Sequence, residues 1–184
     1  MDKHIYRIAL AGNPNCGKTT IFNQLTGTRQ HVGNYPGVTV ERKSGMCRIN
    51  DFQIEIIDLP GTNIERNLYL TTQLAELDLP MLLVFNMIDD AKQRGLHFDF
   101  EKLSGFFGAP IVKTVGSTGF GMKELRNEVY RIAHEATPQR PVKPKYGPKT
   151  DQAIRALTDE VAKVQRPETR LIPARYFAIK LLEN

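Results

Sequence analysis

The sequence predicts an α/β protein: a three-layer α/β/α domain on a mostly parallel sheet with one antiparallel edge strand, followed by a small α-helical domain. Three observations predict this. An apolar strand, a glycine-rich loop and a helix follow one another over residues 6–25. Strand-like and helical segments then alternate to about residue 133, which is typical of a parallel sheet covered by helices. A basic, proline-rich stretch at residues 137–148 precedes two helical segments. We therefore expect a first domain at 1–137 and a linker with the start of a helical domain at 138–184.

The loop at residues 12–19 matches the spacing G-x-x-x-x-G-K-[ST] between a strand and a helix. Its glycines allow backbone N–H groups to wrap a phosphate, and the helix N-terminus adds unpaired donors and partial positive charge. Lys18 would reach the outer phosphates, and the Thr19 hydroxyl would ligate Mg²⁺. These features predict the phosphate site of a P-loop NTPase. Its candidate residues are Gly12, Asn13, Asn15, Cys16, Gly17, Lys18, Thr19 and Thr20.

The composition is that of an ordinary soluble globular protein, with 41% hydrophobic and 24% charged residues. The formal charge of +5 suits either a solvated surface excess or an anionic partner. Two distant cysteines indicate a reducing compartment rather than a disulfide framework. The start of the chain lacks the apolar core of a signal peptide, and the longest apolar run is about half a membrane span. The four histidines show no metal-ligand spacing, so we expect no iron site.

The remaining elements follow from periodicity and turn residues. The first helix should end near Gly27, and a polar segment at 28–37 should form a mobile surface loop. Two strands joined by a turn at Asn50 should form an antiparallel hairpin at the sheet edge. The expected strands are 38–49, 52–58, a fully buried strand at 81–85, and 110–115; the expected helices are 64–77, 100–107, 122–133, 150–165 and 173–182.

Two further motifs follow strand ends, where ligands bind in open α/β sheets. Asp58 and Gly61 form a D-x-x-G motif: the carboxylate can hold Mg²⁺ through water, and the glycine N–H can meet a γ-phosphate. Asn86, Met87 and Asp89 lie in an N-x-x-D motif. Asp89 can accept hydrogen bonds from the N1–H and the exocyclic amine of guanine, whereas adenine cannot supply both donors. Asn86 can brace the loop and approach the other edge of the base. The predicted ligand is therefore GTP or GDP.

Together the motifs resemble the small-G-protein class of P-loop GTPases, and within it the N-terminal cytosolic region of the FeoB family of bacterial ferrous-iron transporters. The similarity covers residues 12–20, V-G-N-Y-P-G-V-T-V-E at 32–41, D-L-P-G at 58–61, residues 63–70 and the tail segment 174–183. The stretch at 32–41 is the most family-specific.

The resemblance implies further roles. Thr39 matches the first switch threonine, which ligates Mg²⁺ and contacts the γ-phosphate, and Asn15 matches the asparagine of potassium-activated GTPases, which holds K⁺. With Lys18 and Gly61, these residues would form the catalytic set. Thr62 follows Gly61 where a glutamine would orient water, so slow hydrolysis is expected.

The implied partner besides guanine nucleotide is the family's C-terminal membrane iron-permease region. The whole protein would then lie at the cytoplasmic face of the bacterial inner membrane, while this fragment would be soluble. Homo-oligomerisation stays open, and nucleic acid is not expected as a partner.

Two departures from the family pattern stand out. Between D-x-x-G and N-x-x-D a G domain needs a switch II helix, a central strand and another helix, about 35 residues in all. Here residues 62–80 hold one helix and no strand, with the splice at residues 62–63. The second departure is at the fifth motif, where the family's Ser-Ala falls on Val115 and Gly116. Backbone N–H groups of Gly116 or Ser117 could still meet the guanine O6.

Three hypotheses follow. The first is a GTP-hydrolysing regulatory domain of a ferrous-iron transporter, dependent on Mg²⁺ and activated by K⁺. The second is a nucleotide-binding pseudo-GTPase switch, whose lost segment leaves binding with little turnover. The third is a stand-alone ribosome-associated GTPase, against which the stretch at 32–41 and the helical tail argue.

Overall fold

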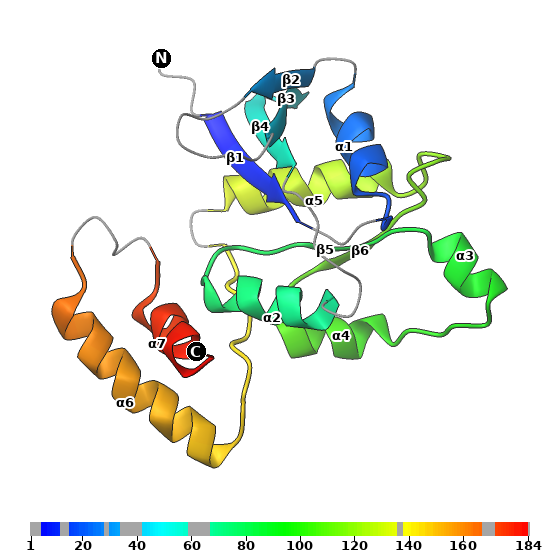
Figure 1. Ribbon diagram of the computed structural model, residues 1–184. Coiled ribbons are helices and arrows are strands. Elements are labelled where there is room, and N and C mark those ends of the chain that lie inside the picture. The colour runs from blue at the N-terminus through cyan, green and yellow to red at the C-terminus, as the bar shows by residue number, and fades with distance from the viewer. Residues whose placement is uncertain are drawn as a thin grey trace.

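The computed structural model describes residues 5–11, 15–27, 30–33, 42–58, 67–135, 138–166 and 172–183. Its strands are β1 (Ile5–Leu10), β2 (Gln30–Gly33), β3 (Arg42–Ile49), β4 (Phe52–Asp58), β5 (Leu83–Phe85) and β6 (Ile111–Lys113). Its helices are α1 (Lys18–Thr26), α2 (Asn67–Glu76), α3 (Ile88–Gln93), α4 (Phe100–Phe107), α5 (Met122–His134), α6 (Pro148–Val164) and α7 (Ala174–Leu182). Figure 1 shows α1 and α5 on one side of β5 and β6, with α2 and α4 on the other. The predicted three-layer α/β/α arrangement is confirmed.

The strands form two separate sheets in the described part of the chain. One has the order β1-β4-β3-β2, and the other pairs β5 with β6. The β1–β4 and β5–β6 pairs are parallel, whereas β3–β4 and β2–β3 are antiparallel. The hairpin of β3 and β4 turns at Asn50, with a left-handed φ of 53°, as the sequence predicts.

Three expectations need correction. Residues 30–33, predicted as part of a loop, form the edge strand β2, so the antiparallel strand β3 lies between β4 and β2 rather than at the edge of the sheet. Backbone pairing to β3 creates β2 despite a polar sequence with little β-propensity. The strand at β5 is half-buried rather than fully buried, because only one of its edges is paired in the described residues. The short helix α3 was not predicted. The predicted segments at 34–41 and 64–66 lie outside the described residues.

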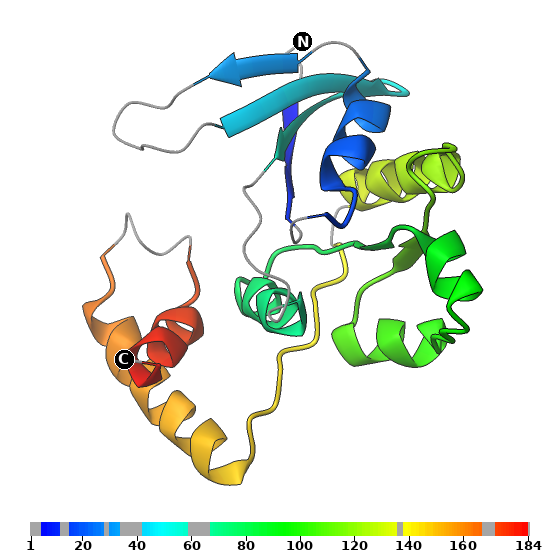
Figure 2. The same ribbon diagram turned by 45° about the vertical axis from the view of Figure 1, so that its right-hand side comes forward.

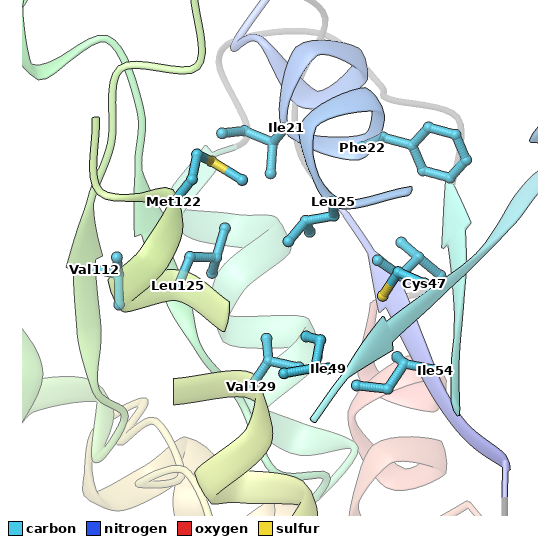
Figure 3. Close-up of a cluster of buried hydrophobic side chains, with 11 residues drawn as sticks. Ile21, Phe22, Leu25, Cys47, Ile49, Ile54, Val112, Met122, Leu125 and Val129 are labelled. Carbon is cyan, nitrogen blue, oxygen red and sulfur yellow. The ribbon is translucent and has the colours of Figure 1, made fainter. Parts of the chain in front are cut away.

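The core lies between the larger sheet and the helices α1 and α5 (Figure 3). Phe22 of α1 is 1% exposed and Ile54 of β4 is 0% exposed, and burying each such side chain contributes about 1.5–3 kcal/mol. The same cluster includes Val112 of β6, so it joins the two sheets through the helices. Its buried members are Ile21, Phe22, Leu25, Cys47, Ile49, Ile54, Ile56, Val112, Met122, Leu125 and Val129.

Arg126 of α5 fixes the C-terminal end of α1. Its guanidinium donates hydrogen bonds to the carbonyl oxygens of Gln24 at 2.6 Å and Leu25 at 3.3 Å. A cation at this position satisfies carbonyls that have no partner within the helix and lies at the negative end of its dipole. Helix α1 therefore keeps its position against α5 while its N-terminal end faces the predicted phosphate loop.

Helices α6 and α7 pack against each other beside α2 and follow the extended stretch 138–147 (Figure 2). This stretch lies along the first domain: the Val142 N–H donates to the Phe107 carbonyl at 2.8 Å. No helix in the described residues combines the length and the apolar character needed to cross a membrane.

A buried ion pair joins α2 to α7. The guanidinium of Arg175 donates to the two carboxylate oxygens of Glu76 at 2.7 and 3.1 Å, and to the Pro144 carbonyl at 3.1 Å. Glu76 is only 1% exposed, and its hydrogen bond holds the pKa of Arg175 above the usual value. Burial, aided by the neighbouring Glu76 carboxylate, raises the pKa of Tyr146 to about 12.

We predict that Arg175→Met lowers the free energy of unfolding by about 3 kcal/mol, because it leaves the buried Glu76 carboxylate without its cation. Urea unfolding followed by circular dichroism measures the loss. Lys163→Met is the matched control: it removes an exposed ion pair to Glu160 and should cost less than about 1 kcal/mol. Equal losses in the two variants would contradict the role assigned to the buried pair.

Candidate functional site

The end of the predicted phosphate loop has a backbone that only certain residues adopt easily. Asn15 and Gly17 have positive φ angles of 63° and 78°, and asparagine and glycine tolerate this left-handed region best. Gly17 lies directly before α1, and its carbonyl accepts from the Ile21 N–H at 3.0 Å. A Cβ at Gly17 would lie 2.1 Å from Nδ2 of Asn86. The second glycine of the motif is therefore required by its angle and by the close approach of Asn86.

Asn86 joins three loops through its side-chain amide. Its Nδ2 donates to the Cys16 carbonyl of the phosphate loop at 3.0 Å. Its Oδ1 accepts from the Gly116 N–H at 2.9 Å and from the Thr114 hydroxyl at 3.1 Å. Thr114 is fully buried, so this amide replaces water for the polar groups around it. The predicted bracing role of Asn86 is present in the structure, because its amide joins the phosphate loop, Thr114 and the Gly116 loop.

The N-x-x-D motif turns sharply after β5. Met87 has a φ of 58° and precedes α3, whose first turn carries Asp89. A non-glycine residue at positive φ costs free energy and often marks a functional turn. The Ile88 N–H donates to the Thr114 carbonyl at 3.3 Å, which ties the turn to the end of β6. The Asp89 side chain is exposed and therefore accessible to a ligand.

The loop at residues 116–119 lies against the start of α1. Gln24 Nε2 donates to the Gly116 carbonyl at 3.1 Å, and a Cβ at Gly116 would lie 3.1 Å from the Thr20 methyl group. The Gly116 N–H is occupied by Asn86. Of the two N–H groups that the sequence offered for the guanine O6, this leaves Ser117, which is exposed.

The structure thus brings Asn15, Cys16, Gly17 and Lys18 together with Asn86, Gly116 and the turn containing Met87 and Asp89. Thr19 and Thr20 are exposed in the first turn of α1, and Lys18 is half-buried there. The backbone of Asp58 pairs with Leu10, directly before the phosphate loop, which places the end of β4 at the same sheet edge. The side chain of Asp58, and Gly12, Asn13, Thr39 and Gly61, lie outside the described residues.

Sequence reasoning missed three contributors to this site: Thr114, Gln24 and Arg126. Thr114 carried a usable signal, since it is a polar residue directly after a strand, where ligands bind in open α/β sheets. Gln24 and Arg126 act through contacts between segments about 100 residues apart in sequence, and nothing in the local pattern marks them.

The family model of "Ferrous iron transport protein B" matches residues 6–63 and 61–129 of this chain. The chain belongs to the FeoB family. A FeoA/FeoB fusion protein of Porphyromonas gingivalis is 43% identical over 216 residues, covering 98% of this chain and 25% of the relative. The Fe(2+) transporter FeoB of Escherichia coli is 34% identical, covering 96% of this chain and 27% of the relative. The chain spans about a quarter of the length of these FeoB relatives.

The cytosolic domain of the T. maritima FeoB iron transporter has the same fold. Its GDP form I superposes with a TM-score of 0.86 at 33% identity, covering 98% of this chain and 81% of that one. A GMPPNP form of the same domain gives a TM-score of 0.83 at 33% identity, with coverages of 95% and 80%. The described chain is thus an N-terminal FeoB G domain.

The family match is interrupted at the point where the sequence predicts a missing segment. The two matched blocks meet at residues 61–63, and the Porphyromonas gingivalis alignment runs over 216 residues although this chain has 184. FeoB relatives therefore carry residues that this chain lacks, and the expected break at residues 62–63 is confirmed.

We predict that Asn86→Ala lowers the free energy of unfolding of the nucleotide-free protein by about 2–3 kcal/mol, because it leaves the Cys16 carbonyl, the Gly116 N–H and the Thr114 hydroxyl without their partner. Thermal and urea unfolding measure this. Asn127→Ala on the exposed face of α5 is the control, with an expected change within about 0.5 kcal/mol. If the two variants were equally stable, Asn86 would not be the connection between the loops.

Proposed function

We propose that this chain is the GTP-binding and GTP-hydrolysing regulatory domain of a ferrous-iron transport protein. The observation that carries the proposal is the Asn86 amide, which holds the phosphate loop and the Gly116 loop beside the N-x-x-D turn. A ligand with phosphates at one end and a guanine at the other would span these loops. The GDP and GMPPNP forms of the T. maritima FeoB cytosolic domain support a guanine nucleotide as this ligand.

Base recognition is assigned to Asp89 and Ser117. The Asp89 carboxylate would accept from the guanine N1–H and amine, while the Ser117 N–H would donate to O6. Asn86 would act from behind the base, since its amide already bonds protein groups. Met87 would position Asp89 through its left-handed turn.

The phosphate end suits Mg²⁺ and K⁺ by the chemistry of its donors. The Thr19 hydroxyl lies in the first turn of α1, and the β1–β4 register places Asp58 at the same edge; both are oxygen donors of the kind that Mg²⁺ prefers. Together with Thr39 they would hold Mg²⁺, and Asn15 would hold K⁺; these ions would offset charge on the phosphates. Lys18 would contact the β- and γ-phosphates, and Gly61 would donate its N–H to the γ-phosphate.

The reaction is in-line attack of water on the γ-phosphate, without a covalent intermediate. Thr62 stands after Gly61 where a glutamine would orient the water, so turnover is slow. We assign the GTP-binding domain to residues 1–137 and the linker with the start of a helical domain to 138–184. The partner is the membrane permease region of the whole transporter, and the domain would work at the cytoplasmic face of the inner membrane.

A second candidate is a nucleotide-binding switch with little turnover. The break in the family match at residues 61–63 favours it, because the residues nearest the γ-phosphate and the attacking water would be those disturbed. No feature of the residues that the structure describes favours the ribosome-associated alternative.

We predict that Asp89→Asn weakens GDP binding at least tenfold, a loss of about 1.4 kcal/mol or more, and strengthens binding of xanthosine diphosphate. An asparagine loses one acceptor for guanine but gains a donor for the second carbonyl of xanthine. Calorimetric titration with both nucleotides measures the exchange. Asp90→Asn, the neighbouring acid on α3, should leave both affinities unchanged, and an equal effect there would remove Asp89 from the base site.

We predict that single-turnover GTP hydrolysis is faster in KCl than in NaCl, and that Asn15→Ala abolishes this difference, because the substitution removes an oxygen ligand of K⁺. Phosphate release after rapid mixing provides the rate, with Asn23→Ala on the exposed face of α1 as the control. Tight GDP binding without turnover in either salt would reject hydrolysis and establish the binding switch.

A further inference from the structure

The two sheets each end in an open edge where they face the middle of the domain. Strand β1 pairs with β4 on one side, and β5 pairs with β6. No strand pairs with the second edge of either one within the described ranges. An open edge leaves a row of backbone N–H and C=O groups without sheet partners, which is a template for another strand.

The directions of β1 and β5 would allow one additional strand to pair with both of them. Asn86 follows the carboxyl end of β5 and donates to the carbonyl of Cys16, in the loop that follows the carboxyl end of β1. The two strands therefore end at the same side of the domain. Since β1–β4 and β5–β6 are both parallel pairs, a strand between β1 and β5 would run parallel to both and complete one continuous sheet.

Strand β5 consists of apolar side chains that are only partly covered. Leu83, Val84 and Phe85 of β5 are only half-buried, and Ala9 of β1 is exposed. Strands inside a parallel sheet are normally covered on both faces and read as continuous apolar runs. The sequence of β5 is thus that of an internal strand, although its position in the described structure is that of an edge.

The family match indicates where in the chain the missing strand belongs. The two matched blocks of the family model meet at residues 61–63, between β4 and β5 in the chain. A connection between parallel strands needs a crossover of a dozen or more residues, and the relatives carry additional residues. We propose that the open edges of β1 and β5 form an acceptor site for one parallel β-strand, an extended peptide that is apolar on both faces, of the kind the relatives encode between the two blocks. Acceptance of this strand does not require nucleotide binding or hydrolysis.

The test uses the chain as it is and peptides in trans. Overlapping fluorescent peptides cover the residues of the Porphyromonas gingivalis relative that have no counterpart in this chain. Fluorescence anisotropy should find one peptide that binds at least tenfold more tightly than its scrambled version and than its variant with a central proline, which removes an N–H from the ladder. Hydrogen exchange should show alternate amides of β1, together with amides of β5, slowed at least tenfold by that peptide, because alternate residues of a parallel strand face the same neighbour.

A graft provides the second arm. The same segment inserted between Gly61 and Thr62 should raise the thermal midpoint by ~5 °C or more, whereas a Gly/Ser insert of equal length should not. Three results would overturn the proposal: no peptide better than its scrambled form, binding that leaves β1 and β5 amides unprotected, or β1 protection that rises with protein concentration alone. The last result would make a second copy of the chain the occupant.

Discussion

The side-chain amide of Asn86 is the interaction on which the arrangement of the site depends. In an open α/β sheet the ligand-binding loops follow the carboxyl ends of the strands. One continuous sheet therefore fixes the positions of these loops relative to one another. Here the described strands form two sheets, so alignment must come from elsewhere. The Asn86 bonds to the Cys16 carbonyl and the Gly116 N–H provide it, and α1 reinforces it by packing against both halves of the core. The bond from Asn86 to Cys16 also requires a glycine at position 17, since a Cβ there would lie 2.1 Å from Nδ2 of Asn86.

Sequence patterns predicted the parts of the fold where local and long-range forces agree. The hairpin at Asn50 and the helices α5, α6 and α7 combine clear periodicity with suitable turn residues, and each was found. Strand β2 was missed because its pairing with β3 determines its conformation and its polar sequence does not. The burial of β5 was overestimated because an apolar run signals the environment that a strand would have in a complete sheet. Helix α3 is short and has no buried residue, so its sequence does not show the helical spacing of apolar residues.

For the candidate site, sequence reasoning found the residue types but not their contacts. Motif spacing located Asn86 and Asp89, yet only the structure separates an amide facing protein from a carboxylate facing solvent. The Gly116 N–H was a plausible ligand donor in sequence, and geometry commits it to Asn86. The phosphate loop lies before the break in the family match, and the groups proposed to bind guanine lie after it. Gly61, proposed for the γ-phosphate, lies at the break itself. The proposed nucleotide binding and the proposed hydrolysis would therefore depend on different parts of this chain.

The ion pair between Glu76 and Arg175 fixes the C-terminal end of α2 to α7. The helix spans Asn67–Glu76, a rod of about 15 Å at 1.5 Å per residue, and its first residue follows closely after the break in the family match. Glu76 terminates the rod at the opposite end and is clamped to α7 through two hydrogen bonds. An α-helix is stiff along its axis. A displacement of Asn67 along this axis would therefore also move Glu76, and with it α7, which packs against α6. Helix α2 would in this way couple the chain that follows the family break to the helices after the linker.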